Sequence, residues 1–368
     1  MSRSMNLMMA ASVAGLLGFY LLYATVPLYA ATGGAGEIGA GAATGAMMLA
    51  TVLAELAVPW LLSRIGYRAA MGLGLVLLGL PALLLPLSPA LPLVLSVALL
   101  RGAGLGILVV AGTALTAELV PAERRSEGLG LYGVAVGVPS ILGLPVGLWV
   151  GDAAGFTAVF IAAGVASLAG LAAVAGLPST RPASVGARHL GGRGLAGPAL
   201  VFAGVTVATG VMVTFLPLAG SPELASAALL AQSLATPVAR WLAGRYGDRH
   251  GSGRLLAPGV LAAVAGVALQ IGTGDAVAVV AGMALFGAGF GVLQNATLAV
   301  MFERGEASGV SALWNLAYDA GMGVGAMGFG LVLGHTGYPM GFALVAALMA
   351  ATLPLTRAGA VRREPSIR

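Results

Sequence analysis

Cysteine and lysine are both absent from this 368-residue chain, and charged residues of either sign are scarce. Without cysteine the chain can form no disulfide, no thiolate metal site and no thiol nucleophile. Without lysine it cannot form a phosphate-binding loop that ends in Gly-Lys-Ser or Gly-Lys-Thr. The three histidines, His189, His250 and His335, all lie in or beside predicted connections, so they are not expected to form one metal site. We therefore predict that the protein is not an enzyme and that it uses no cofactor.

The low charge content also excludes a water-soluble globule. Charged residues make up 8% of the chain and hydrophobic residues 59%, and the mean hydropathy is +0.98. This leaves too little polar surface to cover a soluble fold of this length, so the solvent of most side chains must be lipid. Apolar stretches of about 20 residues recur, each long enough to cross roughly 30 Å of hydrocarbon as a helix.

These stretches predict an all-α membrane protein with twelve transmembrane helices in two pseudo-symmetric six-helix bundles. The predicted spans are residues 6–29, 39–62, 69–88, 92–118, 127–150, 155–178, 197–219, 223–246, 256–273, 275–301, 307–333 and 338–357. The longest polar connection, residues 179–196, falls at the midpoint of the chain. We therefore expect an N-terminal bundle over 1–178, a cytoplasmic linker over 179–196, a C-terminal bundle over 197–357 and a cytoplasmic tail over 358–368.

The arginines predict the orientation in the membrane. All of them except Arg101 and Arg240 lie at the chain ends or in alternate connections, whereas the intervening connections hold acidic residues and no arginine. Arginine-rich connections face the cytoplasm, so both termini are predicted to be cytoplasmic in a multi-pass protein of the cell's inner (plasma) membrane. The net charge of +5 then reflects this topology, and we expect a lipid bilayer, and no nucleic acid, as the protein's surroundings.

An internal repeat relates the two predicted bundles. Gly102–Leu108 (GAGLGIL) returns 185 positions later as Gly287–Leu293 (GAGFGVL), and the same offset carries Ser63–Gly66 onto Asp248–Gly251. Two landmarks in one register indicate a duplication. Because two similar bundles can rock against one another around a shared substrate, the duplication favours a transporter.

Residues 244–254 (GRYGDRHGSGR) resemble the signature that follows the second helix of each half in the major facilitator superfamily. The matching residues are Gly244, Asp248, Arg249, Gly251 and Arg254, and a weaker first copy keeps Arg64, Gly66 and Arg68. That first copy has Pro59 in place of Gly and Ser63 in place of Asp. Arg101 and the glycines after it are similar to the helix 4 signature of the family, and the glycines and prolines of residues 133–147 partly match the helix 5 signature of its exporters.

The resemblance extends over essentially the whole chain. It implies the major facilitator fold, an efflux-like member that carries drugs or metabolites, and a cytoplasmic gate formed by the two signature copies. Asp248 and Arg249 would brace neighbouring helices by charge-assisted bonds in one conformation and release them in the other. They could instead be solvated residues at a helix end that fix the topology.

Four ionisable residues lie clearly within predicted spans, away from the span ends, where charge is costly and therefore a candidate for function: Glu55, Arg101, Arg240 and Asp319. Asp319 is about 12 residues, or roughly 18 Å, into its helix, which places it near the bilayer midplane. Asp319 and Glu55 are candidate proton-coupling groups, although a buried carboxyl can also serve as an interhelical hydrogen-bonding group. We hypothesise that Glu55 pairs with Arg101, and we expect Arg240 to extend toward the cytoplasmic interface.

Polar and aromatic residues within the spans predict a substrate cavity. Asn315 and Asp319 are four residues apart and share one face of a helix, and this face should line a cavity because lipid would leave its donors unpaired. The candidate substrate-binding residues are Arg101, Tyr20, Tyr23, Gln294, Asn295, Trp314 and Asn315. Trp314 could stack on a planar or cationic ligand, or it could simply pack.

The sequence thus favours a monomeric secondary transporter that exports a small organic or drug-like molecule in exchange for protons by alternating access. Uptake of a sugar, metabolite or organic anion is the alternative in the same class, with Arg101 as a ligand for an anion. A non-transporting membrane receptor or scaffold with the same fold is the alternative from another class.

Overall fold

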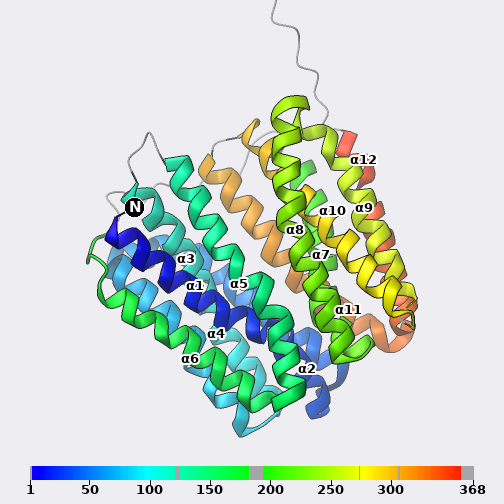
Figure 1. Cartoon of the computed structure of the whole chain (residues 1–368), viewed down its shortest axis with the longest axis horizontal. Helices are drawn as coiled ribbons and strands as arrows, with labels where there is room; N and C mark the ends of the chain where they lie inside the picture. Colours follow the sequence, from blue (N-terminus) through cyan, green and yellow to red (C-terminus); the bar gives the residue numbers. More distant parts are fainter. Residues whose placement is uncertain (1, 121–124, 182–193, 273, 306, 358–368) are drawn as a thin grey trace, which may run out of the picture. The chain divides into compact units, whose positions relative to one another are not determined.

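The computed structural model describes residues 2–120, 125–181, 194–272, 274–305 and 307–357, and every regular element among them is helical (Figure 1). The all-α prediction is confirmed. The helices are α1 (Arg3–Tyr23), α2 (Thr25–Ala30), α3 (Gly36–Gly79), α4 (Leu91–Leu119), α5 (Arg125–Ala154), α6 (Phe156–Ala175), α7 (Ala196–Ala219), α8 (Pro222–His250), α9 (Leu256–Ala268), α10 (Ala276–Phe302), α11 (Ala307–Ala350) and α12 (Leu353–Arg357). Most of the predicted linker and the whole predicted tail lie outside the described residues.

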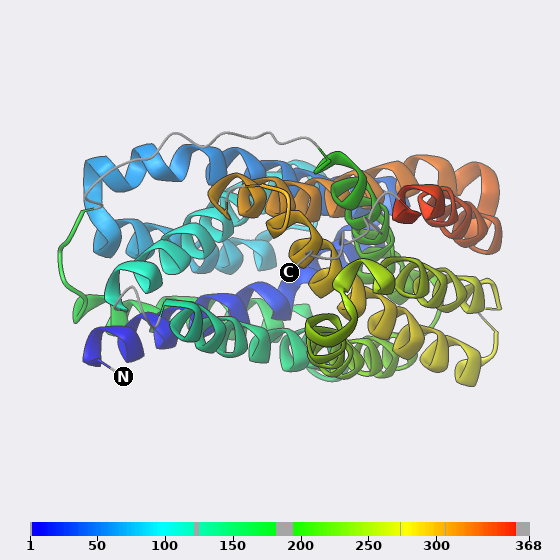
Figure 2. The same ribbon diagram turned by 90° about the horizontal axis from the view of Figure 1, so that it is seen from above.

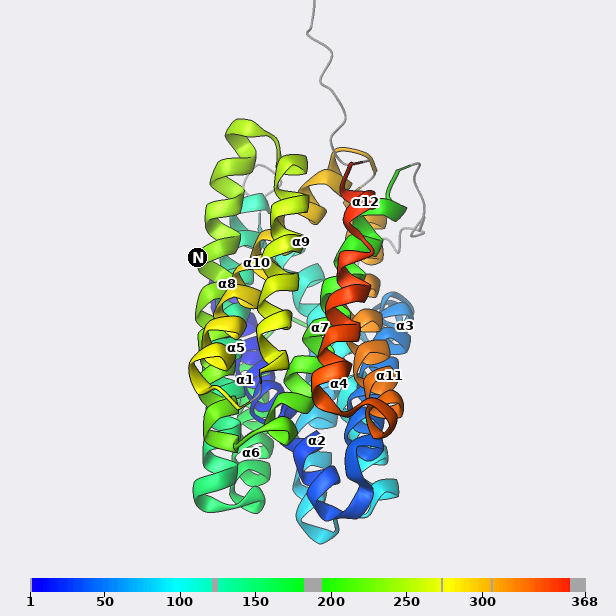
Figure 3. The same cartoon turned by 90° about the vertical axis from the view of Figure 1, so that its right-hand side faces the viewer.

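Two of the long helices contain a reversal of the chain. Within α3, Gly66 has φ 77° and ψ 171° and separates two helices that are joined by a kink; the blue helical segment in Figure 2 turns back on itself. Within α11, Gly337 has φ 70° and ψ 169° and likewise separates two helices joined by a kink; the orange helix labelled α11 in Figure 3 turns back on itself at its lower end. Each break separates two predicted spans. A positive φ of this size is open to glycine and strained for most other residues, which explains glycine at both points.

Among the described residues, eight continuous helical stretches are long and apolar enough to cross a membrane. Two of them, Arg3–Leu87 and Gly309–Arg357, contain the reversals and therefore hold more than one span each. The helix α8 is not among the eight. The helical boundaries are consistent with the twelve predicted spans, and the chain is a multi-pass membrane protein by this criterion.

The chain groups into two compact units, each with its own internal contacts. Unit 1 comprises Met1–Ala187, Gly210–Leu230 and Gly323–Gly334, and unit 2 comprises Arg188–Thr209, Ala231–Met322 and His335–Arg368. Two segments from the second half of the sequence thus belong to unit 1. The predicted division of the chain at residues 179–196 stays a prediction.

The same helix–helix joint occurs once in each unit. In unit 1 the Thr51 hydroxyl of α3 donates to Met47 O (2.9 Å) and to Gly102 O of α4 (3.1 Å). In unit 2 the Thr236 hydroxyl of α8 donates to Gln232 O (2.8 Å) and to Gly287 O of α10 (3.1 Å).

Every residue of the second joint lies 185 positions after its counterpart in the first. The close approach of the helices depends on glycine, because a Cβ at Gly102 would collide with Met47 O, and a Cβ at Gly287 would lie 2.6 Å from Gln232 O. The repeat in the sequence is therefore a repeat of atomic contacts.

Candidate functional site

Arg101 lies one residue before the joint in unit 1 and is completely enclosed. Its side chain is 2% exposed. The guanidinium donates from Nε to Leu78 O of α3 (3.1 Å) and from Nη2 to Gly18 O of α1 (2.9 Å). Arg101 therefore links α4 to two other helices through their backbone carbonyls, and these bonds satisfy donors that would be costly to bury unpaired.

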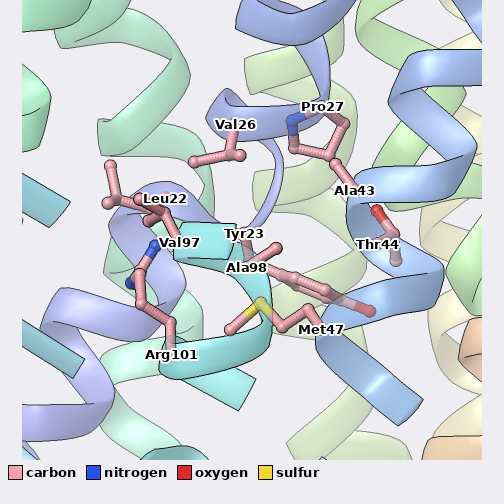
Figure 4. Close-up of a pocket in the computed structure, with 10 residues that line it drawn as sticks. All are labelled: Leu22, Tyr23, Val26, Pro27, Ala43, Thr44, Met47, Val97, Ala98 and Arg101. Atoms are coloured by element: carbon pink, nitrogen blue, oxygen red, sulfur yellow. The ribbon is translucent and has the colours of Figure 1, made fainter. Parts of the chain in front are cut away.

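A small pocket lies beside Arg101 (Figure 4). Arg101 of α4, Tyr23 of α1 and Thr44 of α3 contribute its polar lining, and the remaining lining residues are apolar. The guanidinium of Arg101 and the phenol of Tyr23 point in different directions within it. Its volume is about 10 Å³, which is about the space that one water molecule requires. In this conformation the pocket has no room for an organic substrate.

Thr44 connects this pocket to the segments from the second half of the sequence that belong to unit 1. Its hydroxyl shares a hydrogen bond of 2.9 Å with the hydroxyl of Thr214 of α7, and both residues are buried in unit 1. A Cβ at Gly41 of α3 would lie 2.5 Å from Ala326 O of α11, so these helices also approach closely. The contacts hold α7 and α11 against α3 at the end of unit 1 that is predicted to face outward.

Thr44 and Thr214 are not among the residues predicted from the sequence, although the sequence holds a signal for Thr44. Thr44, Thr51 and Glu55 follow one another at spacings of seven and four residues, which places them on one face of α3. All three are buried. Glu55 lies against Gly106 of α4, with its Cγ 3.2 Å from the position of a Cβ on that glycine. The predicted pairing of Glu55 with Arg101 stays a prediction.

The remaining candidate of the first half, Tyr20, lies next to α5 rather than in the pocket lining. Its ring packs edge-on against Phe19 with 4.8 Å between ring centroids, and Phe19 in turn stacks on Tyr23 at 4.9 Å. A Cβ at Gly143 of α5 would lie 2.5 Å from Cβ of Tyr20. The glycine of α5 therefore allows α1 and α5 to approach closely at Tyr20.

In unit 2 the predicted polar face of α11 contains a buried carboxyl group. Asp319 is 8% exposed, and Asn315, one turn earlier, is half-buried. Ser311, a further turn back, is exposed. The increase in burial from Ser311 to Asp319 places the acid at the enclosed end of the face.

Aromatic side chains form a cluster beside this face. Trp314 stacks on Phe202 of α7 at 4.3 Å between ring centroids, and its Nε1 donates to the Thr297 hydroxyl of α10 (3.2 Å). The cluster consists of Phe202, Phe286, Phe290, Trp314 and Tyr318. One face of Trp314 is thus covered by packing, while the residue as a whole is half-buried. The spacing of four residues in Phe286/Phe290 and Trp314/Tyr318 is the sequence signal for this cluster, which was not predicted.

The amide side chains of unit 2 occupy different environments. Gln294 of α10 is buried, whereas the half-buried Asn295 lies against Gly244 of α8, with its Nδ2 3.3 Å from the position of a Cβ on that glycine. Asn295 therefore lies beside the second signature copy. Gln232 of α8 is 5% exposed, and its Oε1 has no hydrogen-bond partner among the described residues. A buried amide oxygen of this kind can accept a hydrogen bond from water or from a ligand.

The second copy of the gating signature ends α8. Gly251 has φ 90°, which ends the helix, and Asp248, Arg249 and Arg254 are all exposed. Before them, the guanidinium of Arg245 lies over the ring of Trp241 at 4.8 Å. The predicted bracing by Asp248 and Arg249 stays a prediction. Arg240, which was expected to extend toward the interface, is exposed.

The first copy of the signature has the same glycine turn, but the side chains around that turn differ from those of the second copy. Gly66 corresponds to Gly251 in the repeat register and likewise has a positive φ, and the next amide, Tyr67 N, donates to Thr180 O (3.0 Å). The Tyr67 hydroxyl donates to Glu118 Oε1 of α4 (2.7 Å). Ser63, at the position of Asp248, donates its hydroxyl to Trp60 O (2.7 Å). The first copy thus lacks the carboxylate of the second.

Together, the helices long enough to cross a membrane, the duplicated joint and the buried charged side chains define a helical membrane protein built from an internal repeat. A family model described as Major Facilitator Superfamily matches residues 8–220, more than half of the chain. The chain belongs to the major facilitator superfamily, and the predicted fold is confirmed. No curated protein matches the sequence.

Two solved structures are similar over almost the whole chain. One is a mutant of the nucleoside transporter NupG, with a TM-score of 0.74 and 12% sequence identity, covering 96% of this chain and 100% of that chain. The other is a D-xylose–proton symporter, with a TM-score of 0.76 and 15% identity, covering 96% of this chain and 97% of that one. At these identities the similarity concerns the fold alone.

Proposed function

We propose that this protein couples a proton gradient to the export of a small organic or drug-like molecule by alternating access. The observation that supports the proposal most directly is the buried carboxyl of Asp319 on a membrane-spanning helix. A carboxyl that charges when its cavity opens to water and becomes neutral when the cavity closes can link proton movement to the conformational change.

The surroundings of Asp319 support an amphipathic organic substrate. Asn315 shares its helical face, and the half-buried rings of Trp314 and Tyr318 lie on the same helix. Elsewhere in unit 2, Gln232 of α8 has a buried amide oxygen that lacks a donor among the described residues. Aromatic faces, an amide and a carboxyl together suit a planar or cationic molecule that has one or two polar groups.

Uptake is a second candidate because the chain shares its fold with a D-xylose–proton symporter. Binding of an organic anion by Arg101 is less favoured. The guanidinium already donates to two carbonyls, and the pocket beside it is only water-sized.

Vesicles containing the purified protein distinguish the two directions. In proton exchange the substrate moves against the proton flow, so vesicles with an acidic lumen accumulate it. In proton symport, vesicles with an alkaline lumen accumulate it. Flux of a panel of labelled drugs, nucleosides and sugars that is equal with and without the pH gradient would overturn proton coupling, and no flux for any of them would favour a non-transporting receptor.

The variant Asp319→Asn tests the coupling residue. We expect it to lose gradient-driven accumulation and substrate-induced proton movement, and to retain exchange of substrate for substrate, because exchange needs no net proton transfer. Glu223→Gln, at an exposed acid in the first turn of α8, is the matched control and should behave like the wild type. Glu55→Gln tests the second candidate in the same assays. Full gradient-driven accumulation by Asp319→Asn would reject the assignment.

A further inference from the structure

A second cavity, of about 310 Å³, lies in unit 1 at the end predicted to be cytoplasmic. It is formed where the chain of α3 re-enters the membrane after Gly66 and where α6 ends. Arg68 and Ser179 supply its polar groups, and Ile65, Leu171, Val174 and Ala175 supply most of its apolar wall. A cavity of this size is at the lower end of the range of small-ligand sites. It shares no lining residue with the pocket beside Arg101.

The cavity lies in a basic part of the protein surface. Arg64, Arg68 and Arg181 are all exposed, and Cγ of Arg181 lies 3.4 Å from the position of a Cβ on Gly66. The hydrogen bond from Tyr67 N to Thr180 O holds the residues that follow α6 beside the turn at Gly66. An acid in this region, Glu118, already accepts a hydrogen bond from the Tyr67 hydroxyl.

The two signature copies differ in whether a carboxylate accompanies their exposed arginines. In the second copy Asp248 precedes Arg249, so a carboxylate accompanies the arginines. In the first copy the neutral Ser63 precedes Arg64, and its hydroxyl is bonded to Trp60 O. An anion near Arg68 therefore meets no carboxylate at that position.

The neighbouring tryptophan indicates the depth of the cavity in the bilayer. Trp60 is 60% exposed, and the guanidinium of Arg64 lies over its ring at 5.7 Å. Exposed tryptophans of membrane proteins lie at the level of the lipid headgroups, and arginine side chains extend toward the same layer. Ile65 follows Trp60 within two helical turns, and Arg68 lies two residues after the reversal at Gly66, so the cavity is near that level, where the leaflet carries anionic lipids.

We propose that this cavity binds an anionic phospholipid of the cytoplasmic leaflet, with its phosphate on Arg68 and Ser179. A guanidinium can donate two parallel hydrogen bonds to a phosphate, and the serine hydroxyl can donate a third. The glycerol backbone and the first acyl carbons pack against Ile65, Leu171 and Val174. The apolar wall favours a lipid over a free phosphate, because inorganic phosphate would leave that wall uncovered.

Native mass spectrometry of the purified full chain tests the proposal by titration with phosphatidylglycerol and with phosphatidylcholine of the same acyl chains. We expect tighter binding of phosphatidylglycerol, and Arg68→Gln should weaken that binding by about tenfold or more, the effect of losing a charge-assisted hydrogen bond. Arg254→Gln, at the last arginine of the second signature copy, is the matched control and should change the binding less than about twofold, the limit expected for a remote surface charge.

A second variant keeps the charges and fills the space. Ala175→Leu places a larger side chain in the cavity wall and should weaken phosphatidylglycerol binding even though all three arginines remain. This variant decides the question if Arg68→Gln is not recovered as folded protein. Equal affinity for the two lipids, or equal loss in the Arg68 and Arg254 variants, would overturn the site. Inorganic phosphate that competes at the same concentration as the lipid would show a soluble anion as the ligand and would also overturn it.

Discussion

The joint between α3 and α4 and the joint between α8 and α10 are held by the same hydrogen bonds. They differ in the residue that precedes the glycine, which is charged in one joint and apolar in the other. Each uses a threonine that bonds across to the carbonyl of a glycine, at 3.1 Å in both cases. The residue before that glycine is Arg101 in one joint and Phe286 in the other, and both are fully buried. The duplication thus conserves the contacts that bring helices together and leaves the adjoining position free to diverge.

The divergence gives the two units different interiors. Arg101 binds two backbone carbonyls beside a water-sized pocket, whereas Phe286 belongs to an aromatic cluster that continues through Phe290 to Trp314. In unit 1 the buried charge connects helices to one another. In unit 2 the buried carboxyl of Asp319 lies on a helix that also presents half-buried aromatic rings, which is why we place substrate recognition and coupling there.

The largest loss of stability is expected when the glycine of either joint is replaced by leucine. Gly102→Leu and Gly287→Leu each force a side chain into a backbone carbonyl of the neighbouring helix, so each should lower stability by about 3 kcal/mol or more. The midpoint of thermal unfolding in detergent measures this. Gly328→Leu is the control, because a Cβ at Gly328 meets nothing within 4 Å. A joint that tolerates leucine at one copy alone would mean that the two contacts are not equivalent.

The loss of stability should be larger when Arg101 is replaced by leucine than when Phe286 is. Arg101→Leu removes the two hydrogen bonds that the guanidinium donates to Gly18 O and Leu78 O, and it should lower the free energy of unfolding by on the order of 2–4 kcal/mol. Phe286→Leu stays apolar and should cost about 1 kcal/mol.

Arg101→Lys separates a structural role from a substrate-binding role. An ammonium group lacks the planar fork that reaches two carbonyls, so we expect stability to remain low in this variant. Recovery of stability by lysine together with a changed KM for transport would instead assign Arg101 to the substrate.

The smallest effect is expected at the bridging threonines. Thr51→Val and Thr236→Val each remove one interhelical hydrogen bond at nearly constant volume and should each cost about 0.5–1 kcal/mol. The two costs should be similar and additive in the double variant, because the joints are separate. Unequal costs, measured by thermal unfolding, would indicate that one joint is supported by neighbours that the other lacks.

Much of the fold was predictable because membrane helices have a strong local signal. The ends of α4, Leu91–Leu119, lie within a residue of the predicted span 92–118, and the reversals at Gly66 and Gly337 fall between predicted spans. The repeat register was also predictable, since Thr51 and Thr236 lie at the same offset as Gly102 and Gly287. The sequence did not indicate that these four residues meet, because contact across helices depends on packing.

The candidate site was predictable by residue type and only partly by arrangement. Burial of Glu55, Arg101 and Asp319 follows from their places within apolar spans. The bonds of Arg101 to Gly18 O and Leu78 O could not be predicted, because every residue carries a carbonyl and sequence does not select among them. The hydrogen bond between Thr44 and Thr214 joins residues 170 positions apart, and no local pattern connects them.

The sequence by itself determined that this chain lies in a membrane, the approximate positions of its helices, and which segments are repeated. These properties follow from hydropathy, from glycine at points of reversal and close approach, and from a fixed offset, all of which are local. Only the tertiary structure decided that Arg101 is held by backbone carbonyls, that Trp314 is stacked on Phe202, and that Arg68 borders a cavity. Those outcomes depend on which distant segments pack together, because a buried donor or ring takes the partner that the surrounding helices bring within reach.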